Sequence, residues 1–269
     1  MLKQTTTKKP AELEGVRSVK DIVRPRSWCF YGRSGSGKTT LAATFPEPIL
    51  LLDIRDRGTD SITDRKVDVK EIEALEDIED AYYFLKEHPD RYKTIVWDTV
   101  TQVQQLFMEE VTSSSRKNGR TAGMWGSLSQ RQYGDVAAMM KEWGLNYRNL
   151  TDHGMEVVFL AQERTSVIED DGRNNDNMIV PEVGPQIMPS IASFLNANVS
   201  VIGNTFIRLK RTKVKRGNKT TEKEDAQYCL RVGPNPVYTT KLRKPRDIEV
   251  PLFIENPTYK DIIDVIKGE

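Results

Sequence analysis

Cysteine and histidine are scarce in this chain of 269 residues, which contains two of each. Cys29 and Cys229 stand in apolar runs without a C-x-x-C spacing, and His88 and His153 lie far apart in the sequence. A disulfide framework or a zinc site built from these residue types is therefore not expected. The two thiols are interpreted as buried, reduced side chains.

Long hydrophobic runs and an excess of charge are also missing. No apolar run approaches the ~18 residues that a membrane span needs, and the first residues, MLKQTTTKKPAELEG, lack the apolar core of a signal peptide. We expect a cytoplasmic protein that does not enter a membrane. The 40 basic and 39 acidic residues give a net charge of +1, so any nucleic-acid role must depend on local patches.

The composition that remains, 38% hydrophobic and 29% charged, is typical of a soluble globular chain. Its length allows one large α/β domain or two small ones. No internal repeat and no clear linker divides it. The first residues, to about Arg26, are polar and interrupted by Pro10 and Pro25, which favours a flexible segment over residues 1–25.

The stretch GRSGSGKTT fits the pattern G-x-x-x-x-G-K-[ST]. Its glycines let the backbone take positive φ angles and approach an anion closely. Lys38 is spaced to reach the β- and γ-phosphates of a nucleotide, and the Thr39 hydroxyl is spaced to hold Mg²⁺. The expected nucleotide-binding residues are Gly32, Arg33, Ser34, Gly35, Ser36, Gly37, Lys38, Thr39 and Thr40.

The flanks of this stretch support a P-loop rather than an ordinary Gly/Ser turn. An aromatic and apolar run, Ser27 to Tyr31, precedes it, and the helix-compatible Thr39 to Ala43 follows it. Strand, glycine loop and helix therefore come in the order that points the positive end of a helix at phosphates.

Three further apolar runs predict strands buried on both faces of a parallel sheet: Ile49–Leu52, Thr94–Asp98 and Val157–Ala161. The second run ends in an acid, as does the strand that presents an aspartate to Mg²⁺ in P-loop proteins. Asp98 is the candidate for that role. The alternative is an aspartate that only caps the helix expected from about Thr101.

Irregular segments and a hairpin are expected in the second half of the chain. Residues Thr112 to Gln130 and Glu163 to Val180 are rich in loop-forming residues. Strands Phe206–Val214 and Gln227–Val232 are predicted to pair across a basic turn, and a last helix, Tyr259–Lys267, to follow Asn256-Pro257-Thr258.

Five stretches in chain order, GRSGSGKTT, LLLDIRDRGTDS, TIVWDT, VVFLAQ and YTTKLRKP, resemble the RecA-like ATPase core. More narrowly, they resemble the phage-encoded RecA-like proteins that accompany single-strand annealing and recombination. The resemblance covers about residues 26–268. It implies one α/β domain over residues 26–269, with a mostly parallel central sheet flanked by helices and a C-terminal β-hairpin extension. A phage protein would work in the host cytoplasm.

The resemblance also implies roles for single residues. Lys38 and Thr39 would bind the phosphates of ATP and Mg²⁺, and Asp98 would support the metal. Gln162 stands where the family has a polar switch between the γ-phosphate and the DNA-binding loops. Lys241 and Arg243 resemble the cationic pair that reaches into a neighbouring subunit's nucleotide site. A strand-end hydrogen-bonding role for Gln162, and solvated charges for the pair, are the alternatives.

One departure from the family concerns the residue that orients the attacking water. The family has a glutamate after the second core strand, whereas this chain has the sequence DIRDRG. Asp56 is the candidate, with Asp53 as the fallback. Because an aspartate is one methylene shorter, hydrolysis is expected to be slow.

Single-stranded DNA is the expected partner, and a ring or filament of identical subunits with the nucleotide at their interface is the expected assembly. A single-stranded DNA-binding protein is a further expected partner. Seven cations between Phe206 and Lys219 could neutralise phosphates, or form only a solvated basic hairpin, and Trp125 could stack on a base. The cations are Arg208, Lys210, Arg211, Lys213, Lys215, Arg216 and Lys219.

Three functions remain open from the sequence. The first is a RecA-like ATPase that binds single-stranded DNA in recombination or annealing. The second is a nucleotide-gated DNA-binding or annealing module with negligible turnover. The third, a P-loop small-molecule kinase, is disfavoured because no Arg-rich lid segment is recognisable and the Lys241-x-Arg243 pair is present.

Overall fold

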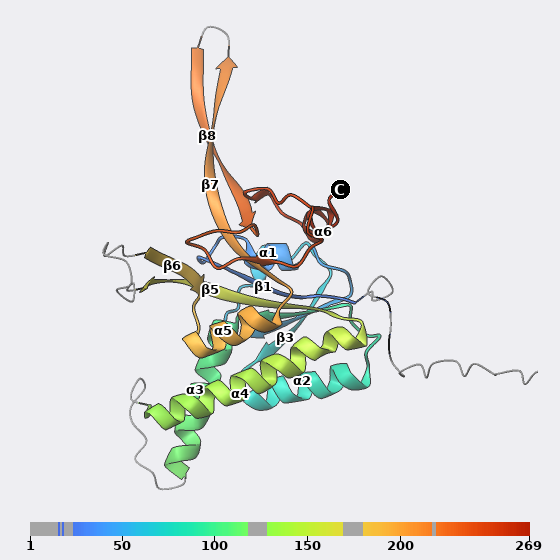
Figure 1. Ribbon diagram of the computed structural model, residues 1–269, viewed down its shortest axis with the longest axis vertical. Coiled ribbons are helices and arrows are strands. Elements are labelled where there is room, and N and C mark those ends of the chain that lie inside the picture. The colour runs from blue at the N-terminus through green and yellow to red at the C-terminus, as the bar shows by residue number, and fades with distance from the viewer. Residues whose placement is uncertain (1–15, 17, 19–23, 118–127, 169–179, 217–218) are drawn as a thin grey trace, which may run out of the picture.

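The computed structural model describes residues 16, 18, 24–117, 128–168, 180–216 and 219–269 (Figure 1). Its ten strands are β1 (Ser27–Gly32), β2 (Ile49–Ile54), β3 (Val67–Ile72), β4 (Thr94–Asp98), β5 (Glu156–Ile168), β6 (Val180–Pro185), β7 (Val201–Arg216), β8 (Lys219–Arg231), β9 (Lys241–Leu242) and β10 (Ile254–Glu255).

The helices are α1 (Lys38–Ala42), α2 (Leu75–Glu87), α3 (Val100–Lys117), α4 (Gln130–Asn149), α5 (Pro189–Asn198) and α6 (Tyr259–Lys267), with short 3-10 turns at Thr59–Ile62 and Leu150–His153. No helix in the described part of the chain is long and apolar enough to cross a membrane.

The strands form one sheet in the order β10-β8-β7-β1-β5-β4-β2-β3, with β6 paired to β5 and β9 paired to β7. Strands β3, β2, β4, β5, β1 and the start of β7 run parallel, and β8, β10, β6 and β9 are antiparallel additions. Strand β5 lies between β1 and β4. The predicted fold, a mostly parallel RecA-like sheet with a C-terminal hairpin, is confirmed.

Two apolar layers cover the two faces of the sheet, because successive side chains of a strand point to opposite sides. On β1, Cys29 and Tyr31 pack in the layer that includes α2, α3, α4 and α5, whereas Trp28 and Phe30 pack with α1 and α6. Figure 1 shows these two groups of helices on opposite sides of the sheet. Every residue of β1, β2 and β4 is buried, which explains their continuous apolar sequences.

Several elements of the structure are longer than predicted. Helix α3 continues to Lys117, so the first residues of the expected Thr112 to Gln130 loop are helical. Trp125 lies outside the described residues. The segment after Val157–Ala161 is not an irregular excursion from Glu163, because β5 continues to Ile168 and pairs antiparallel with β6.

The hairpin of β7 and β8 is longer than predicted and projects far beyond the sheet (Figure 1). Its ladder runs from the pair Asn204 and Arg231 to the pair Arg216 and Lys219. Short β10 pairs with the inner part of β8, and α6 follows it. The C-terminal segment is thereby brought back next to α1.

Candidate functional site

The P-loop has the backbone conformation that its glycines predict. Gly35 and Gly37 have φ angles of 76° and 86°, in the region that side-chain-bearing residues avoid. Gly32 has no room for a side chain, because an added Cβ would collide with Thr205 of β7 and lie 2.6 Å from Ser36 Oγ. Ser36 and Thr205 share a hydrogen bond of 2.7 Å, which fixes the loop to the neighbouring strand.

Lys38 is a buried cation, with 6% of its surface exposed. Its Nζ donates to the carbonyl oxygens of Gly32 and Arg33, each at 3.0 Å, and to Gln162 Oε1 at 3.4 Å. None of the ion pairs within the described ranges includes it. Burial lowers the pKa of this ammonium, although the carboxylates of Asp98, Asp56 and Glu163 oppose the shift.

Asp98 lies at the end of β4 and faces the first turn of α1. Its Oδ2 accepts a hydrogen bond of 2.6 Å from the Thr39 hydroxyl. The N-terminus of α3 is served instead by Thr99, whose side chain accepts from the backbone of Gln102. Burial raises the pKa of Asp98 to about 6, and the Thr39 hydrogen bond acts against that shift.

Asp53 and Asp56, the two alternatives for the water-orienting acid, occupy different positions. Asp53 is buried, and its Oδ1 accepts the backbone N–H groups of Asp56 and Arg57, each at 3.0 Å. Asp56 is exposed and lines the same cavity as Lys38 and Asp98. The carboxylate of Asp53 therefore holds the turn that carries Asp56.

Gln162 lies beside the P-loop because β1 and β5 are parallel neighbours, with Gly32 opposite Gln162. Its backbone N–H donates to Thr101 Oγ1, and its carbonyl accepts from Gln186, just after β6. The side chain of Gln162 contacts Lys38 Nζ, and its main chain contacts Gln186 at the end of β6. Gln162 thus joins the P-loop to the paired strands β5 and β6.

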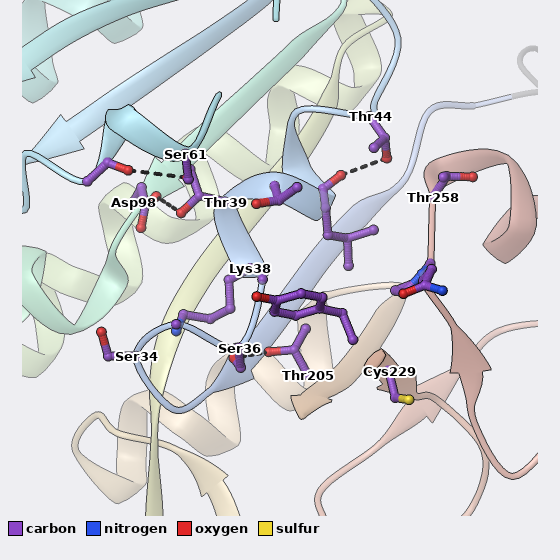
Figure 2. A pocket seen from close by; sticks show the side chains of 18 of the residues that line it. Ser34, Ser36, Lys38, Thr39, Thr44, Ser61, Asp98, Thr205, Cys229 and Thr258 are labelled. Atoms are coloured by element: carbon purple, nitrogen blue, oxygen red, sulfur yellow. Dashed lines mark hydrogen bonds between the residues drawn. The ribbon is translucent and has the colours of Figure 1, made fainter. Parts of the chain in front are cut away.

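These side chains meet in a cavity of about 850 Å³ at the carboxyl ends of the parallel strands, where α/β sheets bind ligands. Figure 2 shows Ser34, Lys38 and Asp98 on one side of it, and Thr44, Cys229 and Thr258 on the other. Both cysteines are free and buried.

A comparison with protein families gives a match to the AAA domain over residues 24–243, most of the chain. The chain belongs to this AAA domain family. No curated protein matches it. Among solved structures, it is similar to a KaiC-like protein from the hyperthermophilic archaeon Pyrococcus horikoshii OT3, at 12% identity and a TM-score of 0.40, over 86% of this chain and 89% of that one. With its P-loop and sheet order, the AAA domain is a P-loop ATPase domain of RecA-like type.

Lys241 and Arg243 are not in the cavity of this AAA domain. Lys241 Nζ donates to the carbonyls of Asn196 and Ala197 at 2.6 and 3.2 Å, and an Arg243 N–H donates to Ala197 at 3.3 Å. Both cations thus cap the C-terminus of α5, where carbonyls lack helical partners. Burial and the Arg243 charge lower the pKa of Lys241.

The cavity also contains residues that no sequence motif predicts. Arg65 brings a second cation, and Thr205 supports the P-loop from β7. Tyr228 and Asn256 also line the cavity, and the Tyr228 ring lies beside Gly37 of the P-loop. The sequence segment Asn256-Pro257-Thr258 predicts only the start of α6, which Thr258 does cap, and the pairing of β8 with β10 is what brings it to the site.

The residues present fit a nucleotide with Mg²⁺. Within the described residues, the buried Lys38 ammonium donates hydrogen bonds to neutral oxygens and forms no ion pair, and phosphate oxygens would give it an anionic partner. The Thr39 hydroxyl and the Asp98 carboxylate are hard oxygen donors of the type that Mg²⁺ prefers.

Proposed function

We propose that this AAA domain binds ATP with Mg²⁺, hydrolyses the ATP, and acts on single-stranded DNA in recombination or strand annealing. The observation that supports the nucleotide part most directly is the convergence of Lys38, Thr39 and Asp98 at one end of the cavity. The DNA part depends on the family resemblance and on the basic hairpin of β7 and β8.

In this proposal, Lys38 exchanges the carbonyls of Gly32 and Arg33 for phosphate oxygens. Thr39 and Asp98 would hold Mg²⁺, which when bound neutralises charge on the β- and γ-phosphates. Asp56 would orient a water molecule and accept its proton. Gln162 would lose its contact with Lys38 and transmit the change along β5.

The charges along the hairpin favour its tip as the DNA contact. In the inner part, acids stand opposite three of the seven cations, in the pairs Lys210–Asp225, Arg211–Glu224 and Lys213–Glu222. Arg208 forms an ion pair with Glu255 at 2.8 Å. Near the tip, Lys215 is opposite Thr220, and Arg216 is opposite Lys219. Positive charge therefore accumulates at the end farthest from the sheet.

An ATPase assay with and without single-stranded DNA tests the proposal. The parent protein should hydrolyse ATP and turn over faster with DNA, while Lys38→Ala should show only the background rate of the preparation. A parent protein that neither binds nor hydrolyses ATP would refute the nucleotide assignment. A rate that DNA does not change, together with no DNA binding, would refute the DNA assignment.

A second function, a nucleotide-gated DNA-binding module with negligible turnover, is favoured by one feature of the cavity. Among the described residues, its only carboxylates are Asp56 and Asp98. The Asp98 carboxylate accepts a hydrogen bond from Thr39. Asp56 is exposed on a loop, and a carboxylate in that position holds a water molecule only weakly. Tight ATP binding without turnover in the same assay would support this function.

A further inference from the structure

The root of the β7–β8 hairpin lies against the P-loop. Asn204 and Thr205 are the first two residues of β7 that pair with β8, and Thr205 stands opposite Gly32 in the parallel ladder with β1. The projecting hairpin and the phosphate-binding loop are therefore adjacent parts of one sheet, although they lie far apart in the sequence (Figure 1).

Thr205 contacts the P-loop at two positions. It leaves no space for a side chain at Gly32. Its hydroxyl donates to the Tyr31 carbonyl at 3.3 Å and shares a hydrogen bond of 2.7 Å with Ser36, so the Ser36 hydroxyl is the donor in that second bond (Figure 2). Because Ser36 and Thr205 are both buried, this chain of hydroxyls fixes a side chain in the middle of the loop.

Tyr228 contacts the P-loop from the other strand of the hairpin. It lies on β8 opposite Ile207, with 44% of its surface exposed. A Cβ added at Gly37 would lie 3.0 Å from Tyr228 Cδ1 and 3.7 Å from Cε1. Gly37 has a φ angle of 86° and is the N-cap of α1, so the ring packs against the point where the loop becomes a helix.

A third contact reaches the loop from the opposite face of the sheet. Asn204 points to that face, because successive side chains of a strand alternate. Its amide donates to Glu163 at 3.4 Å, and Glu163 forms an ion pair of 2.9 Å with Arg33 of the P-loop. The Arg33 side chain is largely exposed, so this link is weaker than the contacts of Thr205 and Tyr228.

We propose that Thr205 and Tyr228 are positioning residues of the phosphate site, and that through them the hairpin root sets how tightly the P-loop holds phosphate. This inference depends on the proposed function, since it assumes that the P-loop binds phosphates. A loop that is already held in its binding conformation loses less conformational freedom when the ligand binds. Such coupling is reciprocal, so phosphate bound at the loop stabilises the hairpin root in turn.

Isothermal titration calorimetry of the full chain with ATP and with inorganic tripolyphosphate tests the positioning role. Thr205→Val leaves the buried Ser36 hydroxyl without its acceptor and should weaken both ligands by about tenfold, the equivalent of one hydrogen bond. Tyr228→Ala removes the ring beside Gly37 and should weaken both by about fivefold. ATP and tripolyphosphate should be affected equally, because both contacts act on the phosphate end of the site.

Conservative variants and matched controls separate positioning from general damage. Thr205→Ser keeps the hydroxyl and Tyr228→Phe keeps the ring, so both should restore the affinity of the parent. Thr212→Val, at an exposed position farther along β7, and Tyr83→Ala, at an exposed position of α2, make comparable substitutions away from the P-loop. Both controls should bind ATP and tripolyphosphate as the parent does.

Hydrogen exchange at saturating tripolyphosphate tests the reciprocal effect, which a purely structural role would not produce. In the parent, the ligand should slow amide exchange at Phe206 to Leu209 and Tyr228 to Leu230 by about tenfold relative to the amides of α2. In Thr205→Val saturated with the same ligand, this additional protection should be lost.

Two results would overturn the inference. One is an unchanged affinity for tripolyphosphate in both Thr205→Val and Tyr228→Ala, and the other is a hairpin root in the parent whose exchange does not respond to the ligand. If Thr205→Val does not fold, Tyr228→Ala, at a partly exposed position, decides the first point alone. A parent that binds neither ATP nor tripolyphosphate would instead overturn the proposed function.

Discussion

Lys38 illustrates how far a single residue can be understood from local chemistry. A lysine with its ammonium buried is costly unless it is paired, yet its neighbours in the structure are two carbonyls and an amide oxygen. Natural proteins tolerate such arrangements where function requires them. The residue is therefore better explained by an anionic ligand than by the stability of the fold.

The first prediction concerns this side chain. Lys38→Ala should lower ATP affinity at least 100-fold, because a charge-assisted contact to phosphate is lost, and should leave the melting temperature unchanged or higher. Lys86→Ala, at an exposed position of α2, is the control and should behave as the parent does. Fluorescence titration and thermal unfolding measure the two quantities. Equal ATP affinities for Lys38→Ala and the parent would reject the P-loop assignment.

The second prediction concerns the charge on Asp98. Its pKa is raised from 3.8 to about 6 by burial, so the folded protein binds the proton more tightly than the unfolded chain does. The protonated Asp98 carboxyl therefore stabilises the fold fully below about pH 4, and this contribution to the free energy of unfolding is lost as the pH rises through about 6. At pH 8, without Mg²⁺, the ionised carboxylate should destabilise the fold by about 2–3 kcal/mol.

Asp98→Asn tests this expectation, because it removes the charge and keeps an oxygen for Thr39. In urea unfolding at pH 8 with EDTA, the variant should be more stable than the parent, and the difference should disappear near pH 4. The effect of Mg²⁺ on ATP affinity should be lost in the variant, and in the parent below pH 6. A variant less stable than the parent at pH 8 would contradict the assignment of an unfavourable buried charge.

At the scale of elements, the β7–β8 hairpin differs most from its sequence pattern. The cations between Phe206 and Lys219 suggest a uniformly basic strand and turn, but acids on β8 stand opposite those in the inner part. Arg211 and Glu224, for example, form an ion pair at 2.6 Å. Only the register of the two strands reveals this pairing, which changes the expected location of the DNA contact.

The third prediction follows from the register. Lys215→Glu/Arg216→Glu should weaken binding to single-stranded DNA and reduce the salt slope by about 1.4, at ~0.7 per phosphate contact. Arg211→Glu/Glu224→Arg, which exchanges the two charges of an inner pair, is the matched control and should change neither quantity. Fluorescence anisotropy over a salt series measures both. If only the inner exchange weakens binding, the contact lies on the inner hairpin and the tip assignment is wrong.

The elements that the sequence predicts well are those whose signal is local. The P-loop needs positive φ angles at fixed spacing, and β1, β2 and β4 are buried on both faces, so their positions follow directly from glycine and from apolar runs. Asp98 follows from the end of such a strand. Helix α3 was predicted too short because its last residues, TSSSRK, have loop-like composition.

The parts that the sequence does not predict depend on contacts between distant residues. Tyr228 reaches the site because β8 pairs with β7, and Asn256 because β10 pairs with β8. The position of Lys241 and Arg243 at α5 depends on the pairing of β9 with β7. Asp53 and Asp56 are three residues apart and indistinguishable by type, and only the turn, in which Asp53 is buried and Asp56 exposed, separates their roles. No local pattern contains this information.

At the scale of the whole molecule, the P-loop and the cationic pair Lys241 and Arg243 lie at different places in the chain's fold. The pair contacts the C-terminus of α5 and is not in the chain's own cavity. If these cations serve catalysis, they must do so at another subunit's site, after releasing the α5 carbonyls. Among the described residues, the cations that line the chain's own cavity are Lys38 and Arg65.

The last prediction is that the active site is shared between subunits, with Lys241 and Arg243 acting in trans. A cation that stabilises charge on the transferred phosphoryl group can contribute ~10³–10⁵ in rate. Lys38→Ala subunits and Lys241→Ala/Arg243→Ala subunits should each be inactive alone. Mixed in a head-to-tail assembly, they should regain part of the ATPase rate, because some interfaces combine an intact P-loop with intact cations.

Two controls make this experiment decisive. Thermal unfolding of Lys241→Ala/Arg243→Ala reports whether loss of the α5 contacts, rather than loss of a catalytic cation, inactivates the protein. Arg65→Ala tests the cation that lies with Lys38 in the cavity of the same chain. If Lys241→Ala/Arg243→Ala is fully active while Arg65→Ala is not, the catalytic cation acts in cis. A lack of recovered ATPase activity in co-assembled mixtures of folded variants would also exclude a site shared between subunits.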